Sequence, residues 1–177
     1  MTSRDDNKKF LESLPKDKLM DLMFTHIRGL WTVDGLYFLG IEDRESTEAA
    51  TETDVNVWRV MGKIEARRLR EVLEIKDGGL QSLAKALRST SWFLDLEDGE
   101  LVETKDSVIL RNLKCRVQTT RIGKGLPEFS CKGVRSAFFI AFAKEFNPDI
   151  EMTCKVCPPD KHPDNLWCEW EFRQRHH

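Results

Sequence analysis

The sequence predicts an α+β fold in which an N-terminal helical layer packs on a mostly antiparallel sheet. Apolar residues recur at helical spacing through the first half of the chain, whereas from Trp92 onward they alternate as in strands. One helix interrupts this second half before a C-terminal hairpin that carries cysteines. Helices followed by strands in this order are typical of α+β domains.

The 177 residues are expected to form a single domain, 1–177, because a chain of this length is within the range of one hydrophobic core. The helical part is expected over about 10–90 and the sheet-containing part over about 91–173. Neither an internal repeat nor a low-complexity linker divides the chain.

Composition and charge exclude several classes of partner. The 28 Lys and Arg residues face 30 Asp and Glu residues, so there is no basic surplus for a nucleic acid. The start, "MTSRDDNKKF", lacks the apolar core of a secretory signal, which favours a cytoplasmic protein. The apolar stretch 19–41 carries charged residues at intervals, so we expect a buried helical hairpin there and no membrane span.

Three helices are expected in the first half. The first covers 17–43, and Gly29, Gly35 and Gly40 are expected to break it or to admit a close neighbour. The second covers 46–75. A third, shorter helix follows the "KDGG" segment. The predicted core stripes of the second and third helices are Val57, Met61, Ile64 and Val72, widened by Trp58, Leu69 and Leu73, and then Leu80, Leu83, Ala84 and Leu87.

The second half is expected to begin with strands over 92–122. A hairpin turn is predicted at Asp98-Gly99 and a second turn near Lys105-Asp106. The segment "EFSCKGVRSAFFIAFAKEF" is predicted to be a helix that starts near Pro127 and stops at Asn147-Pro148.

The cysteines of the second half are predicted to converge. Alternation in the last hairpin directs Cys154, with Ile150, Met152 and Val156, to the apolar face of its strand. The same reasoning directs Cys168 inward with Leu166, Trp170 and Phe172. Cys131 shares a helical stripe with Val134, Phe138 and Phe142, and Cys157 completes a C-x-x-C motif.

Four converging thiols suit a tetrahedral metal, so Cys131, Cys154, Cys157 and Cys168 are predicted to hold a structural zinc ion. An Fe–S cluster on the same residues is an alternative, and so is plain burial of small apolar side chains. Glu151 or His162 is a candidate to replace one cysteine ligand. An odd number of cysteines, five, argues against a disulfide framework.

A second reading of the thiols is catalytic. A thiol-dependent hydrolase would use Cys131, expected in the first turn of its helix, or Cys115. Only His26 and His162 are internal candidates for the base, because His176 and His177 end the chain as a predicted tail. Cys115 is otherwise interpreted as structural.

Polar residues among the helical apolar stripes suggest a cavity. Glu65 and Arg68 flank the stripe of the second helix, and Asp34 and Glu42 lie among aromatic residues. One interpretation is the polar end of a ligand pocket, and the alternative is an ion-pair network between helices. The predicted pocket residues are Trp31, Phe38, Trp58, Glu65 and Arg68, with a small aromatic or heterocyclic ligand. Since familiar catalytic motifs are missing from the sequence, we favour a non-enzymatic, sensor-like binding domain.

The order of the four cysteines resembles that of the four-vinyl-reductase-type domain and its small-molecule sensor relatives. In the phenol-responsive members the matching positions bind zinc beside an aromatic ligand pocket. This sequence departs from them in a longer hairpin loop and in Cys154, where those sensors place Glu. Because such domains pair through helical faces and the segment 30–41 is unusually apolar, we expect a homodimer.

Three phrases resemble an uncharacterised family of small prokaryotic cytosolic proteins: "WTVDGLYFLGIEDR", "DVNVWRVMGKIEARRL" and "CPPDKHPDNLWCEWEF". The chain is also distantly similar to L-2-amino-thiazoline-4-carboxylate hydrolases. The first resemblance implies no activity, and the second adds a heterocyclic substrate to the hydrolase alternative.

Overall fold

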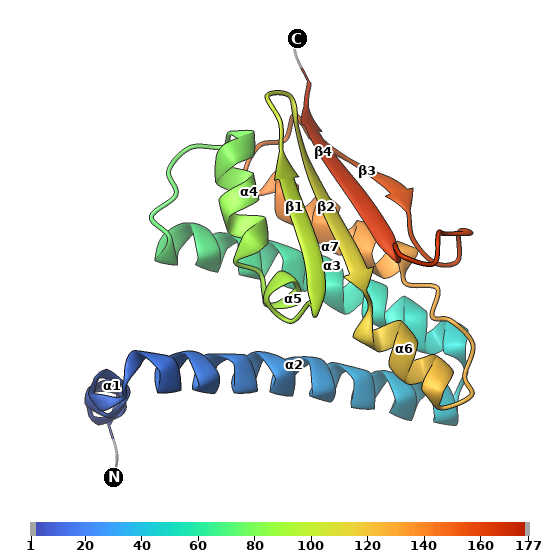
Figure 1. Cartoon of the computed structure of the whole chain (residues 1–177), viewed down its shortest axis with the longest axis horizontal. Helices are drawn as coiled ribbons and strands as arrows, with labels where there is room; N and C mark the ends of the chain where they lie inside the picture. Colours follow the sequence, from blue (N-terminus) through green and yellow to red (C-terminus); the bar gives the residue numbers. More distant parts are fainter. Residues whose placement is uncertain (1–2, 176–177) are drawn as a thin grey trace.

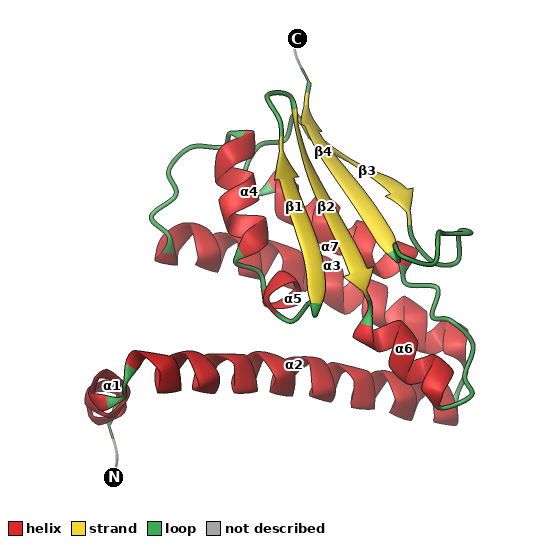
Figure 2. Cartoon of the chain, viewed as in Figure 1, coloured by secondary structure: helices red, strands yellow, loops and turns green. Residues whose placement is uncertain are grey.

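A computed structural model describes residues 3–175, which build seven helices and one four-stranded antiparallel sheet (Figures 1 and 2). The helices are α1 (Arg4–Ser13), α2 (Lys16–Arg44), α3 (Thr47–Val72), α4 (Leu80–Arg88), α5 (Ser91–Leu94), α6 (Arg116–Gly123) and α7 (Lys132–Lys144). The strands are β1 (Asp98–Glu103), β2 (Ser107–Lys114), β3 (Ile150–Val156) and β4 (Cys168–Gln174). The predicted α+β class is confirmed.

The sheet has the order β1-β2-β4-β3, so the two hairpins meet through the β2–β4 pair. In that pair Asn112 lies opposite Cys168, which brings a polar residue beside a cysteine at one end of the sheet. The β1–β2 turn is closed by Thr104, whose Oγ1 accepts the Ser107 backbone N–H at 2.9 Å. The predicted turn near Lys105-Asp106 is therefore confirmed.

Helices α3 and α7 form the layer behind the sheet (Figure 1). The run of aromatic residues on α7 explains this position, because Phe138, Phe139 and Phe142 are completely buried. The Phe139 ring lies 5.2 Å from that of Trp170 and 5.6 Å from that of Phe172, both on β4. These large apolar side chains make the core between helix layer and sheet.

The buried face of α3 differs from the predicted stripe. Trp58, Gly62 and Ala66 face the core, whereas Val57 and Val72 are exposed by 52% and 76%. The predicted stripe was wrong at Val57 and Val72. The large side chain of Trp58 and the close backbone contact at Gly62 fix the rotation of α3 about its own axis.

Helix α2 is one continuous helix, so the predicted interruptions at Gly29, Gly35 and Gly40 are wrong. No neighbouring atom lies within 4 Å of a Cβ built at any of these three glycines, so they admit no close neighbour either. The expected burial is also wrong, because Trp31 is the only residue of α2 that is buried. The helix runs beside α3 and beneath the sheet and leaves much of its surface open (Figure 1).

Three segments predicted as strand or turn have another structure. Residues after Thr90 form the short helix α5, since the Thr90 hydroxyl accepts the Phe93 N–H and caps it. Asp98 and Gly99 begin β1 instead of forming a hairpin turn. The end of the predicted strand region, 116–123, is helix α6.

Helix α7 starts later than predicted. Its first residue is Lys132, with Cys131 just before it, whereas the sequence suggested a start near Pro127. The Gln118 side chain explains the difference, because it bonds both the backbone N–H and the C=O of Phe129 at 2.8 Å. These bonds hold the connection in a loop. The predicted stop before Asn147-Pro148 is confirmed.

Within residues 3–175, no helix combines the length and the apolar character needed to cross a membrane.

Candidate ligand-binding cavity

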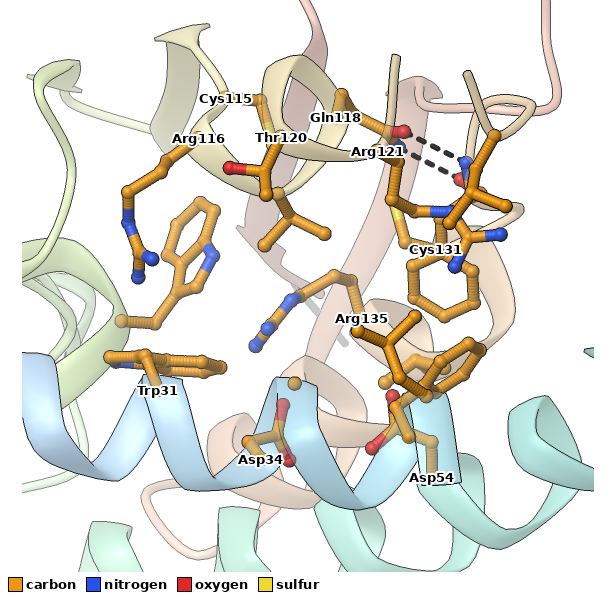
Figure 3. A pocket seen from close by; sticks show the side chains of 18 of the residues that line it. Trp31, Asp34, Asp54, Cys115, Arg116, Gln118, Thr120, Arg121, Cys131 and Arg135 are labelled. Atoms are coloured by element: carbon orange, nitrogen blue, oxygen red, sulfur yellow. Dashed lines mark hydrogen bonds between the residues drawn. The ribbon is translucent and has the colours of Figure 1, made fainter. Parts of the chain in front are cut away.

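A cavity of about 240 Å³ lies between α2, α6 and α7 and reaches the paired ends of β2 and β4 (Figure 3). Aromatic rings supply much of its wall, namely Trp31, Phe38, Trp92 and Phe129. The Phe38 and Phe129 rings meet edge to face at 4.6 Å, which joins α2 to the loop before α7. Such an apolar enclosure with a few polar groups is typical of small-molecule sites.

One arginine occupies the middle of this aromatic wall. The guanidinium carbon of Arg135, on α7, lies 4.8 Å, 5.1 Å and 5.4 Å from the ring centroids of Trp31, Trp58 and Trp92. Trp31 and Trp58 are themselves stacked at 4.6 Å. Arg135 is only 9% exposed, and its Nη1 is buried without a hydrogen-bond partner among the described residues. Three indoles thus stabilise the cation while one of its donors stays unused.

Two carboxylates lie on the side of Arg135 that α2 and α3 form (Figure 3). Trp58 Nε1 donates to Asp34 Oδ1 at 3.1 Å. Burial raises the pKa of Asp34, partly offset by the charge of Arg135. Burial, and then the charge of Asp34, raise the pKa of Asp54 to about 7. Asp54 therefore changes its charge near neutral pH.

Two further arginines, both on α6, fix this helix at the opposite side of the cavity. Arg121 forms a bidentate pair with Glu42 of α2, both N–O distances being 2.9 Å, and its hydrogen bonds lower the pKa of Glu42. Arg116 Nη2 lies 2.7 Å from Asp95, whose other oxygen accepts from Arg28 at 2.7 Å. The Nε of Arg116 is buried without a partner in the described part of the chain.

Three of the five cysteines, Cys115, Cys131 and Cys168, line the cavity. The Sγ atoms of Cys131 and Cys157 are 3.5 Å apart, and the Cys157 thiol also forms a hydrogen bond with the side chain of Cys168. The structure therefore brings Cys131, Cys157 and Cys168 together as predicted. Cys154 is on the inward face of β3 but outside the cavity wall.

The cysteines differ in their tendency to ionise. A hydrogen bond with Cys157 lowers the pKa of Cys131, and the charge of Arg135 and an N–H from Gln118 act in the same direction. The hydrogen bonds with Cys131 and Cys168 raise the pKa of Cys157. Burial raises the pKa of Cys115 and of Cys154 to about 11. If one thiol of this set ionises, it is Cys131.

The cysteines supply the thiolate donors that zinc prefers. In residues 3–175, no three His, Cys, Asp or Glu side chains are placed so that they could hold an ion. The two substitute ligands are engaged elsewhere. Glu151 pairs with Arg175, and His162 lies 3.6 Å from Glu128 and packs on the Trp167 ring.

The five predicted pocket residues have different positions. Trp31 and Phe38 line the cavity. Trp58 lies behind Trp31, and Glu65 is buried with its Oε1 accepting the Ser91 N–H at 2.7 Å. Arg68 is exposed and is not part of the wall of this cavity. The ion-pair alternative applies to Glu42, which pairs with Arg121.

Sequence reasoning missed the residues that give the cavity its charge: Arg135, Asp54 and Arg116. Arg135 had a detectable signal, because it is the one cation in the apolar run "GVRSAFFIAFA" and follows Val134 of the stripe predicted to be buried. An arginine in such a place needs compensation by rings or anions. Asp54 and Arg116 lie at ordinary amphipathic positions, and no local pattern distinguishes them.

The fold and this cavity define an α+β protein with an aromatic cavity whose wall carries charged side chains. Residues 12–174 match the profile of a family of unknown function, DUF6125, and the chain belongs to that family. The predicted resemblance to an uncharacterised family is thereby confirmed. Neither a curated protein nor a solved structure matches the chain.

Proposed function

We propose that this protein is a cytoplasmic, sensor-like domain that binds a small aromatic or heterocyclic molecule in the cavity between α2, α6 and α7. The observation that carries the proposal is the position of Arg135, a buried cation packed on three indoles at the wall of an otherwise aromatic cavity. Burial of an arginine with an unpaired donor costs stability, and a ligand that accepts from it explains why the group is there.

Tryptophan fluorescence is expected to report binding. Trp31 and Trp92 line the cavity, so an aromatic ligand should quench or shift their emission in a titration with a library of small aromatic and heterocyclic compounds. Trp31→Phe should reduce the signal, whereas Trp167→Phe, in the loop beside His162, should keep it. If no compound produces a change that depends on Trp31 or Trp92, the proposal is wrong.

A structural metal on Cys131, Cys154, Cys157 and Cys168 stays a prediction, supported by the donor type and by the contacts that Cys157 makes with Cys131 and Cys168. Protein purified without added metal should carry about one zinc per chain by elemental analysis. Cys168→Ser should lower both the zinc content and the melting temperature, whereas Cys115→Ser should leave the zinc content unchanged. Brown protein containing iron would favour the Fe–S alternative, and metal-free, fully stable protein would reject both.

The thiol-dependent hydrolase is a second candidate, favoured by the lowered pKa of Cys131 at the cavity wall. Against it, the described cavity wall includes no histidine to act as base, and burial raises the pKa of Cys115. The reading requires that alkylation of one cysteine abolishes turnover of a thiazoline-type substrate while the fold persists.

We also propose a homodimer that forms through α2. Leu36 and Tyr37 are exposed by 64% and 73%, and Leu30 and Val33 are exposed on the same helix. A second copy of the chain would cover this apolar surface. Light scattering at micromolar concentration should give a dimer mass, and Val33→Glu with Tyr37→Glu should give a monomer. A monomer mass for the unmodified protein would contradict the proposal.

A further inference from the structure

The charges around the cavity are separated by sign (Figure 3). Asp34 and Asp54 lie on the side formed by α2 and α3. Arg116, on α6, faces them across the cavity, and Arg135 extends between the two sides. A ligand in the cavity therefore meets two carboxylates at one side, the Arg116 guanidinium at the other and the Arg135 guanidinium between them.

On both sides of the cavity, polar groups could form further hydrogen bonds or ion pairs that the described residues do not supply. Nη1 of Arg135 and Nε of Arg116 are buried donors without a partner, and Arg135 is more than nine-tenths buried. On the acidic side, two aspartates interact unfavourably with each other in a desolvated place, as the effect of Asp34 on Asp54 shows. The part of the chain that the structure describes supplies one N–H to this side, that of Trp58, and it is a neutral donor.

We infer that the ligand of this cavity is a small amphoteric molecule, whose carboxylate binds Arg135 and Arg116 and whose amino or amidinium group binds Asp34 and Asp54. This inference rests on the proposed function and adds the ligand's charges to it. A planar or aromatic body would pack against Trp92 and Phe38, which line the cavity.

A ligand with one charge fits this layout less well. A simple carboxylate would satisfy the arginines but would be repelled by the aspartates, and a simple amine would relieve the aspartates and face the arginines. An amphoteric ligand pairs with both sides at once. The volume of about 240 Å³ corresponds to about eight water molecules of bulk liquid, so the ligand is on the order of ten non-hydrogen atoms.

Four probes with one skeleton test the inference by calorimetric titration at pH 7.5. L-phenylalanine carries both charges, 3-phenylpropionate only the carboxylate, 2-phenylethylamine only the ammonium group, and 3-phenylpropan-1-ol neither. We expect L-phenylalanine to bind at least tenfold tighter than each of the other three. Single-charge probes that bind as tightly as L-phenylalanine would overturn the inference and leave the proposed function standing. Binding by none of the four would count against both.

Two variants test which residues recognise each charge. Asp54→Asn should weaken the binding of L-phenylalanine about tenfold, because its amino group loses a partner. The affinity for 3-phenylpropionate should stay unchanged or increase. Arg135→Lys should weaken the binding of L-phenylalanine and of 3-phenylpropionate and leave the affinity for 2-phenylethylamine nearly unchanged. Melting temperatures of the two variants control for folding. Equal losses for all probes in both variants would show a general disturbance of the cavity and would reject the assignment.

Discussion

Asp54→Asn is expected to stabilise the protein by roughly 2–4 kcal/mol at pH 8 and to have little effect near pH 4. In the native state burial and the charge of Asp34 raise the pKa of Asp54 to about 7, from an ordinary value of 3.8. The Asp54 side chain is half-buried, so solvent screens this effect only in part.

The sign of the pH dependence follows from proton uptake. Between pH 3.8 and pH 7 the native state holds the Asp54 proton more tightly than the unfolded state does. The free energy of unfolding therefore falls as the pH rises through this window, and the loss is complete above pH 7. Asn is neutral at every pH and nearly the same shape, so the variant avoids the loss. The charges that act on Asp54 are Asp34 of α2 and Arg135 of α7.

Urea unfolding of the wild type and the variant at several pH values from 4 to 8 measures the difference. Asp43→Asn, an exposed carboxylate on α2, is the matched control and should change stability by less than about 0.5 kcal/mol. A stability difference that does not depend on pH, or a variant less stable than wild type at pH 8, would show that Asp54 is not strained as argued. If the variant is more stable but no longer binds the amphoteric ligand, Asp54 lowers the stability of the wild type and is retained for binding.

Gly62→Ala is expected to destabilise the protein by roughly 1–3 kcal/mol. A Cβ at Gly62 would lie 2.6 Å from the carbonyl oxygen of Phe138 and 3.4 Å from the Cβ of Ala141. The obstacle is the backbone of α7, so α3 and α7 would have to move apart and open the aromatic core. The same movement would shift Arg135 relative to Trp58.

Thermal and urea unfolding check this result, with Gly29→Ala as the control. Gly29 is also a glycine inside a helix, but a Cβ there meets nothing within 4 Å. Alanine should therefore stabilise α2 by up to about 1 kcal/mol through its higher helix propensity. If both substitutions stabilise the protein, the close approach of α3 and α7 at Gly62 does not limit packing.

The sequence by itself determined the fold class, most of the helices and the inward faces of the last hairpin. These features depend on local periodicity, which fixes the face of an element from the residues of that element alone. Cys168, Trp170 and Phe172 are buried on one face of β4 as alternation predicted. The stripe of Phe138 and Phe142 on α7 was predicted in the same way.

Only the tertiary structure decided how the elements pack and which polar groups meet. The segment Arg116–Gly123 is helical, and Gln118 of this helix forms a hydrogen bond with Phe129 in the next loop. The residue pattern of the segment itself gives no sign of this contact. Asp34, Asp54 and Arg135 come from three different helices and meet because Trp58 packs on Phe138, which places α3 between α2 and α7. The charge of the cavity is a property of that packing, since the electrostatic energy of each group depends on its distance to groups on other elements.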